Sequence, residues 1–319
     1  MPLIIDYTSE GFPAGSPVTN GGAVLTTNWN ELLWAAVTVG RPNRQYVFRH
    51  GNASMYEALF RLSLVRMALE QSGPSAYRLR RTDAAKTLDP SEKGAVNYFI
   101  GMVFCKLFSW KLLNAPWAIH LDAFRPQLNR FLTGRSRPDL VAETASGEWL
   151  SLEAKGRISA PSNEAKNKAK QQAERLVSVN GAPIQFHIGC ITYLRNDTIR
   201  FFWRDPEPPQ DKPHRQIKLE LNDNIWRYYY RPMLDLIMSR PQSFDAMLHE
   251  TVLMPIKELD IEIGIHPEVL KPLSHDQWIY AKRSYRPAAE YFRKEGYQPD
   301  GVRIVAGPTW LLPFAENNT

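Results

Sequence analysis

Two carboxylates and a lysine stand in the middle of the chain at a spacing that could support metal-dependent chemistry. Asp139 follows Pro138, and Glu153 and Lys155 are separated by a single residue. In an extended strand, side chains two positions apart point to the same face, so Glu153 and Lys155 would be neighbours. Mg²⁺ is usually held by one or two carboxylates, by water and by substrate phosphate oxygens. The residues therefore predict a Mg²⁺ site for phosphate chemistry, with Asp139 and Glu153 as ligands.

The lysine and one backbone carbonyl would complete this site. A bound Mg²⁺ lowers the pKa of a water and neutralises charge that develops on a phosphate. Lys155 could orient that water or stabilise the developing oxyanion. The carbonyl of Ala154 is an expected further ligand. Asp139, Glu153 and Lys155 are thus the expected catalytic residues, with Mg²⁺ as cofactor and Mn²⁺ able to replace it.

A β-hairpin is predicted to bring these residues together. Residues 139–143 form a short strand candidate, Ser146-Gly147-Glu148 is a turn signal, and residues 149–155 alternate with a period of two. The alternation would turn Glu153 and Lys155 toward solvent or a cleft, away from an apolar face. Pairing across the turn would let the carboxylates of Asp139 and Glu153 converge at one end of a sheet.

The flanking segments predict an α/β fold. A helix is expected from Pro90 to about Leu113, with Asp89 as its N-cap. Another is expected from Ser162 to about Val179, followed by a long apolar strand from Ile184 to Leu194. The order helix, strand, strand, helix, strand across residues 90–194 describes a mixed sheet flanked by helices.

This arrangement resembles the PD-(D/E)xK nuclease superfamily, which has the restriction-endonuclease-like fold. The resemblance rests on Pro138-Asp139 and Glu153-Ala154-Lys155 with a short hairpin between them, and it covers about a third of the chain. The family's core runs helix, strand, strand, strand, helix, strand, and residues 90–194 fit it with one strand unassigned. The resemblance implies a Mg²⁺-dependent nuclease that hydrolyses phosphodiester bonds of DNA, in a role such as restriction or phage defence.

The resemblance also implies residues on the two helices. Many members place an acidic residue on the first core helix, where Glu92 is the candidate for a further metal ligand. Some members carry a glutamine or lysine on the helix after the motif. Lys168, Gln171 and Gln172 are the candidates there, and no pattern selects one of them.

Basic residues gather around the motif. The whole chain has a net charge of +6, and residues 125–175 contain ten basic and six acidic residues, so most of the excess lies here. Such an excess fits a polyanion, although a solvated helix face would have the same pattern. The expected nucleic-acid contacts are Arg135, Arg137, Arg157, Lys166, Lys168, Lys170, Gln171 and Gln172.

Each part of the motif also occurs elsewhere in the chain. Pro299-Asp300 is a second Pro-Asp pair without a triplet after it, and Glu164-Ala165-Lys166 is a second triplet within a predicted helix. Only residues 138–155 have the context of strand, turn, strand and helix. Two alternatives stay open: a catalytically silent nuclease-fold protein that binds nucleic acid or a protein partner, and an unrelated α/β protein in which Glu153 and Lys155 form a surface ion pair.

The remaining sequence suggests three regions. These are an N-terminal mixed region (1–88), the nuclease core (89–204) and a C-terminal α+β region for recognition or partner binding (205–319), which opens with a proline-rich loop at 205–214. No phosphate-binding loop occurs, so a motor such as an ATPase or helicase would be a separate partner. The beginning of the chain lacks signal-peptide features and no segment resembles a membrane span, so a cytoplasmic location is expected.

Overall fold

The computed structural model describes residues 2–39, 53–72, 77–121, 137–205, 216–221, 225–278, 280 and 290–312. Within these residues, one large mixed sheet contains β1 (Leu3–Glu10), β2 (Gly21–Thr27), β3 (Leu69–Gln71), β4 (Leu79–Arg81), β5 (Trp117–His120), β6 (Leu140–Glu143), β7 (Trp149–Gly156), β8 (Leu176–Val179), β9 (Ala182–Arg195), β10 (Thr198–Arg204) and β11 (Ile217–Leu219). A small antiparallel sheet contains β12 (Met254–Ile256), β13 (Ile261–Ile265) and β14 (Val302–Ala306).

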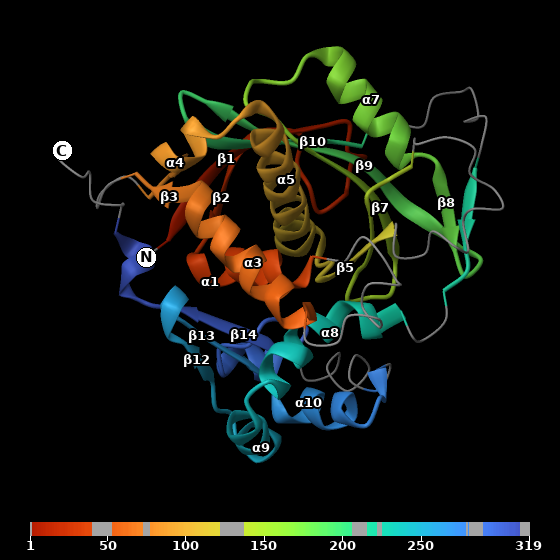
Figure 1. The fold of residues 1–319 in the computed structure, drawn as a ribbon. Coiled ribbons are helices and arrows are strands. Elements are labelled where there is room, and N and C mark those ends of the chain that lie inside the picture. The colour runs from red at the N-terminus through yellow and green to blue at the C-terminus, as the bar shows by residue number, and fades with distance from the viewer. Residues whose placement is uncertain are drawn as a thin grey trace, which may run out of the picture.

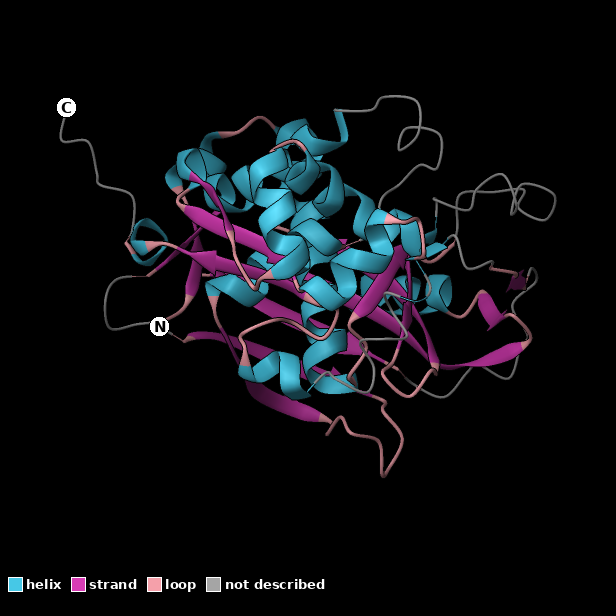
Figure 2. Cartoon of the chain, turned by 90° about the horizontal axis from the view of Figure 1, so that it is seen from below, coloured by secondary structure: helices cyan, strands magenta, loops and turns pink. Residues whose placement is uncertain are grey.

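The helices of the described chain surround these sheets (Figure 1). They are α1 (Trp29–Thr38), α3 (Ala53–Ala68), α4 (Asp83–Thr87), α5 (Pro90–Leu113), α7 (Asn163–Ala173), α8 (Ile225–Met238), α9 (Pro241–His249) and α10 (Pro267–Ser274). Seen from below, the strands run through the middle of the molecule and helices pack over them (Figure 2). The α/β class and the mixed sheet flanked by helices are therefore confirmed.

Strand β7 lies at the centre of the large sheet, whose main path runs β2-β1-β10-β9-β7-β6-β5. It pairs antiparallel with β6 and parallel with β9, so the predicted hairpin of β6 and β7 is present. Strand β5, which the sequence left unassigned, pairs antiparallel with β6. From residue 90 to 195 the elements follow the order α5, β5, β6, β7, α7, β9, with the short β8 before β9.

Glycines allow helices to pack closely on both faces of this part of the sheet. A Cβ at Gly156 would overlap the backbone carbonyl of Asn97, which fixes α5 directly over the end of β7. On the other face, a Cβ at Gly189 would lie 2.7 Å from the backbone nitrogen of Lys170 on α7. Strand β7 is therefore covered on both faces. Of the two surroundings expected for its polar face, solvent or a cleft, open solvent is wrong for Glu153, whereas Lys155 keeps 39% of its side chain exposed.

Helix α5 matches its predicted bounds. The Asp89 side chain caps it by accepting from the N–H groups of Ser91 and Glu92, and Asn114 ends it in the left-handed conformation that favours asparagine or glycine. By length and composition α5 could cross a membrane, but 72% of its apolar window is buried inside the protein. Its hydrophobicity is thus explained by its place in the core.

Other predicted bounds were wrong. The helix from Ser162 ends at Ala173 rather than near Val179, because Leu176–Val179 forms strand β8 against β9 and β11. Two of those four residues are β-branched valines, which favour strands. Further along the chain, α9 ends at His249, and Met254–Ile256 forms β12.

The three regions inferred from the sequence share one core. Strands β1 and β2 extend the same sheet that holds β7, and a buried polar cluster joins the C-terminal region to α1 and α5. In that cluster the Trp34 indole donates to Asp300 (2.7 Å), and Lys106 donates to the Tyr229 hydroxyl (2.8 Å). Asp300, the second Pro-Asp pair, is therefore a buried structural residue.

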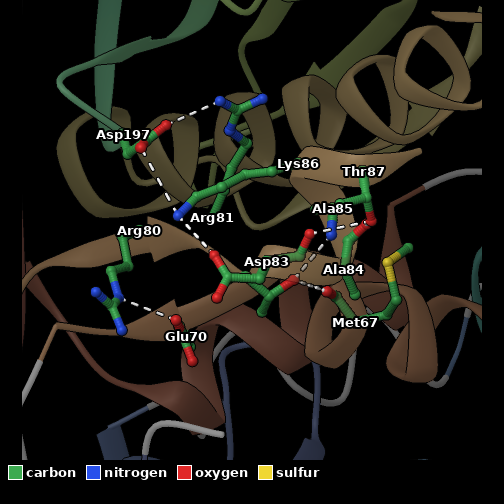
Figure 3. A network of polar contacts seen from close by, with 11 residues as sticks. Met67, Glu70, Arg80, Arg81, Asp83, Ala84, Ala85, Lys86, Thr87 and Asp197 are labelled. Atoms are coloured by element: carbon green, nitrogen blue, oxygen red, sulfur yellow. Dashed lines mark hydrogen bonds and ion pairs between the residues drawn. The ribbon is translucent and has the colours of Figure 1, made fainter. Parts of the chain in front are cut away.

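The arginine run before α4 is largely neutralised by ion pairs. Arg80 pairs with Glu70 (2.9 Å), and Arg81 pairs with Asp197 in the β9–β10 turn (2.8 Å). Lys86 of α4 pairs with Asp83 (2.8 Å), and Figure 3 shows the contacts side by side. This network ties β3, β4 and α4 to the β9–β10 hairpin.

Candidate active site

Asp139 lies just before β6, at the end of the hairpin opposite the turn. Leu140 pairs with Leu152, which places Asp139 beside Glu153 in the next position of the register. One Asp139 oxygen, Oδ2, accepts from the backbone N–H of Ala154 at 3.0 Å. The structure thus brings together the two carboxylates that the sequence singled out, on adjacent strands.

Glu153 is almost fully buried, with 1% of its surface exposed. Its Oε1 accepts from the Lys155 ammonium, whereas its Oε2 is buried and accepts from no donor in the described part of the chain. A buried carboxylate oxygen without a partner is costly, and an ion or water that binds it is the usual reason for it to persist. Burial of Glu153 also argues against a surface ion pair.

The Lys155 side chain joins this buried carboxylate to the solvent. Lys155 stands near the end of β7, next to Gly156, and 39% of its side chain is exposed while its ammonium binds Glu153. Such a lysine can contact a substrate at the surface and remain oriented by the carboxylate beneath it.

The surroundings of Glu153 disfavour its ionised form. Burial, the largest cause, and the nearby charge of Asp139 together raise the pKa of Glu153 to about 8, although Lys155 acts in the opposite direction. A divalent cation would relieve both unfavourable effects, because it favours the ionised carboxylates. The donor set therefore fits a hard cation such as Mg²⁺.

This shift predicts how pH affects the metal-free protein. Glu153 keeps its proton up to about pH 8 in the folded chain, but loses it near its ordinary value of 4.5 when unfolded. The unfolded state therefore binds fewer protons, and the Glu153 contribution to the free energy of unfolding falls as pH rises from about 4.5 to about 8. Urea denaturation with EDTA at pH 5 to 8 should show a slope that Glu153→Gln reduces. An unchanged slope in this variant would contradict the shift.

The backbone of Ala154 faces the same site. Its N–H points to Asp139, and in a strand the N–H and C=O of one residue point to the same side. Strand β6 begins at Leu140, so its described ladder ends opposite Leu152 and does not reach Ala154. This orientation suits the Ala154 carbonyl as the further ligand expected from the sequence.

Two residues near Asp139 were missed by the sequence reasoning. The hydroxyl of Tyr98, on α5, lies 2.9 Å from Nε2 of His120, on β5, and donates to Asp139 Oδ1 at 3.4 Å. His120 is buried and Tyr98 is 40% exposed. No local spacing connects these residues, because the packing of α5 on the sheet brings them together.

Glu92 does not take the place expected of a metal ligand. Its carboxylate is exposed and accepts from the backbone N–H of Asp89 at 3.3 Å, which completes a capping box at the start of α5. Tyr98, the residue of α5 that reaches Asp139, is six positions further on, about 9 Å along the helix. The structure supports the capping role of Glu92 and gives the metal role no support.

The expected nucleic-acid contacts divide into two groups. Lys170 is buried and donates to Asp205 (2.7 Å), and Lys166 pairs with Glu10 (3.0 Å), so both lysines serve the fold. The burial of Lys170 argues against its assignment to phosphates, whereas Lys166 is half-buried in its ion pair and its assignment stays a prediction. Arg157, Lys168 and Gln171 are exposed, Arg137 and Gln172 are half-buried, and Arg135 lies outside the described residues.

The described residues offer a pair of carboxylates rather than a larger cluster, since they contain no group of three or more His, Cys, Asp or Glu side chains placed to hold a metal. Two carboxylates are sufficient for Mg²⁺, which keeps several waters. Comparisons of the chain with family models, curated proteins and solved structures find no match. The site's own geometry therefore carries the functional argument.

Proposed function

We propose that this chain is a Mg²⁺-dependent nuclease of the PD-(D/E)xK type, with a restriction-endonuclease-like core, that hydrolyses phosphodiester bonds of DNA. One observation carries the proposal: Glu153 is buried beside Asp139 and Lys155, and its Oε2 has no hydrogen-bond partner among the described residues. The order α5, β5, β6, β7, α7, β9 supports it, because β5 supplies the strand that the resemblance required.

Each residue then has a defined role. Asp139, Glu153 and the Ala154 carbonyl would hold Mg²⁺, which supplies Lewis-acid stabilisation of charge on the phosphate. Lys155 donates to a phosphate oxygen or to the attacking water and so stabilises negative charge as it develops. Glu153 keeps the lysine ammonium at the site, and burial strengthens these interactions by excluding water.

The surface beside Lys155 supports a polyanionic substrate. A narrow groove where α5 meets the end of β7 is bordered by two basic residues, Lys93 and Arg157, and by Arg81, whose guanidinium is already paired with Asp197. Arg157 follows Lys155 by two positions, so a nucleic-acid backbone that reaches Lys155 would also approach this groove. Phosphates neutralised there would release counterions, and affinity would fall with rising salt. A cytoplasmic role in restriction or phage defence is part of the same proposal.

The wild-type protein provides the test of this function. Incubated with supercoiled plasmid, single-stranded DNA and RNA, it should cleave DNA with Mg²⁺ or Mn²⁺ and leave it intact in EDTA. Agarose and denaturing gels would report the products. Binding of DNA without cleavage under every metal condition would favour the catalytically silent alternative. Neither binding nor cleavage of any nucleic acid would refute the proposal.

A further inference from the structure

The residues around Asp139 form a continuous chain of polar contacts from three elements. His120 is the last residue of β5 and pairs in register with Leu140, the neighbour of Asp139. Tyr98 comes from α5, and its hydroxyl stands between the His120 ring (2.9 Å) and Asp139 Oδ1 (3.4 Å). A single hydroxyl therefore links the first core helix to both strands at the site.

The direction of each hydrogen bond follows from the chemistry of the groups. An ionised carboxylate only accepts, and a tyrosine hydroxyl has one proton to donate. When Tyr98 gives that proton to Asp139, its oxygen can only accept from His120. In the tautomer with its proton on Nε2, His120 donates to the Tyr98 oxygen and so orients the hydroxyl toward Asp139.

These contacts leave Asp139 oriented but still able to bind a cation. Oδ1 accepts from Tyr98 and Oδ2 accepts from the Ala154 N–H, so both oxygens are held in place. A carboxylate has about four acceptor positions, and the two contacts use two of them. The remaining acceptor positions are available to a cation, and Glu153 is close enough for its carboxyl to interact with Asp139.

We propose that Tyr98 and His120 are positioning residues that orient the Asp139 carboxylate for the divalent metal. This inference rests on the proposed function and deepens it. Groups that hydrogen-bond to metal-binding side chains hold them in the binding orientation, and their loss typically costs roughly 10- to 100-fold in metal affinity. A purely structural link between α5 and β5 would change stability instead.

The test measures Mn²⁺ affinity by isothermal titration calorimetry. Tyr98→Phe and His120→Leu should each weaken Mn²⁺ binding roughly 10- to 100-fold. His120→Gln, whose amide N–H can replace Nε2–H, should retain near wild-type affinity. The matched control is Tyr7→Phe, which removes a tyrosine hydroxyl from β1, a strand separated from β7 by β10 and β9. Saturating Mg²⁺ should restore most of the cleavage rate of Tyr98→Phe.

Two results would overturn the inference, and they are distinguishable. If Tyr98→Phe binds Mn²⁺ within about twofold of wild type while Glu153→Gln does not bind, the positioning role is wrong and the metal site stands. If Glu153→Gln binds Mn²⁺ as tightly as wild type, the metal site itself is wrong and the positioning role falls with it. Loss of thermal stability in EDTA by Tyr98→Phe, without a change in Mn²⁺ affinity, would also reject the role.

Discussion

Replacing Glu153 with glutamine should abolish Mg²⁺-dependent cleavage while leaving the protein folded. The substitution keeps the shape of the side chain but removes a ligand charge, and a loss of about 4 kcal/mol of transition-state stabilisation corresponds to about 10³-fold in rate. Because the raised pKa leaves the buried Glu153 largely protonated in EDTA below about pH 8, the neutral glutamine should preserve stability there. Single-turnover cleavage and thermal denaturation of the same preparations would measure both effects.

Loss of Lys155 should impair cleavage without weakening metal binding. Lys155→Met should lower cleavage by about 10²- to 10³-fold, as loss of an oxyanion-stabilising donor does, while Mn²⁺ affinity remains. Glu164→Gln is the matched control for Glu153→Gln. Glu164 begins the second acid-Ala-Lys triplet, and its side chain is exposed in the first turn of α7. Cleavage by Glu153→Gln at the wild-type rate would place the activity elsewhere in the chain.

Asp300→Asn should destabilise the protein strongly, by about 3 kcal/mol or more. Every contact to its carboxylate comes from a donor: the Trp34 indole, the Tyr229 hydroxyl and the backbone N–H of Val302. An amide nitrogen cannot accept, so one of these buried donors would lose its partner, and Lys106 would lose a nearby opposite charge. The urea midpoint of unfolding should fall well below that of wild type.

Asp139→Asn is the matched control, because Asp139 and Asp300 each follow a proline. It should abolish cleavage and lower the urea midpoint much less than Asp300→Asn does, because Asp139 is half-buried and water can replace the acceptor lost to Tyr98 or to the Ala154 N–H. Asp139→Asn should therefore lose activity and keep most of its stability, whereas Asp300→Asn should lose stability. A midpoint for Asp300→Asn close to that of wild type would contradict the structural role of the buried cluster.

Local signals explain which parts of the fold could be predicted from the sequence. Asp89-Pro90 begins α5 and Asn114 ends it, and both signals act within one turn. The alternation in Trp149–Lys155 similarly defined β7. Strand β5 was missed because its four residues are all buried and show no alternation.

Long-range packing explains what was missed at the site. The burial of Glu153 depends on α7 covering the face that the alternation assigned to solvent or a cleft. The local sequence predicted that Lys166 and Lys170 contact phosphates, but in the fold they form ion pairs with Glu10 and Asp205. Tyr98 and His120 are 22 positions apart and meet only because α5 packs over the sheet. Such contacts leave no pattern in the local sequence.

The central claim is that Asp139 and Glu153 together hold a divalent metal. A crystal soaked in Mn²⁺ tests it most directly through the anomalous difference map. The expected result is a peak about 2.1 Å from an oxygen of Asp139 and from Glu153 Oε2, as for Mg²⁺-type coordination, and its absence from crystals of Glu153→Gln. Saturating Mn²⁺ that produces no peak between these carboxylates, or an equal peak in the variant, would contradict the claim.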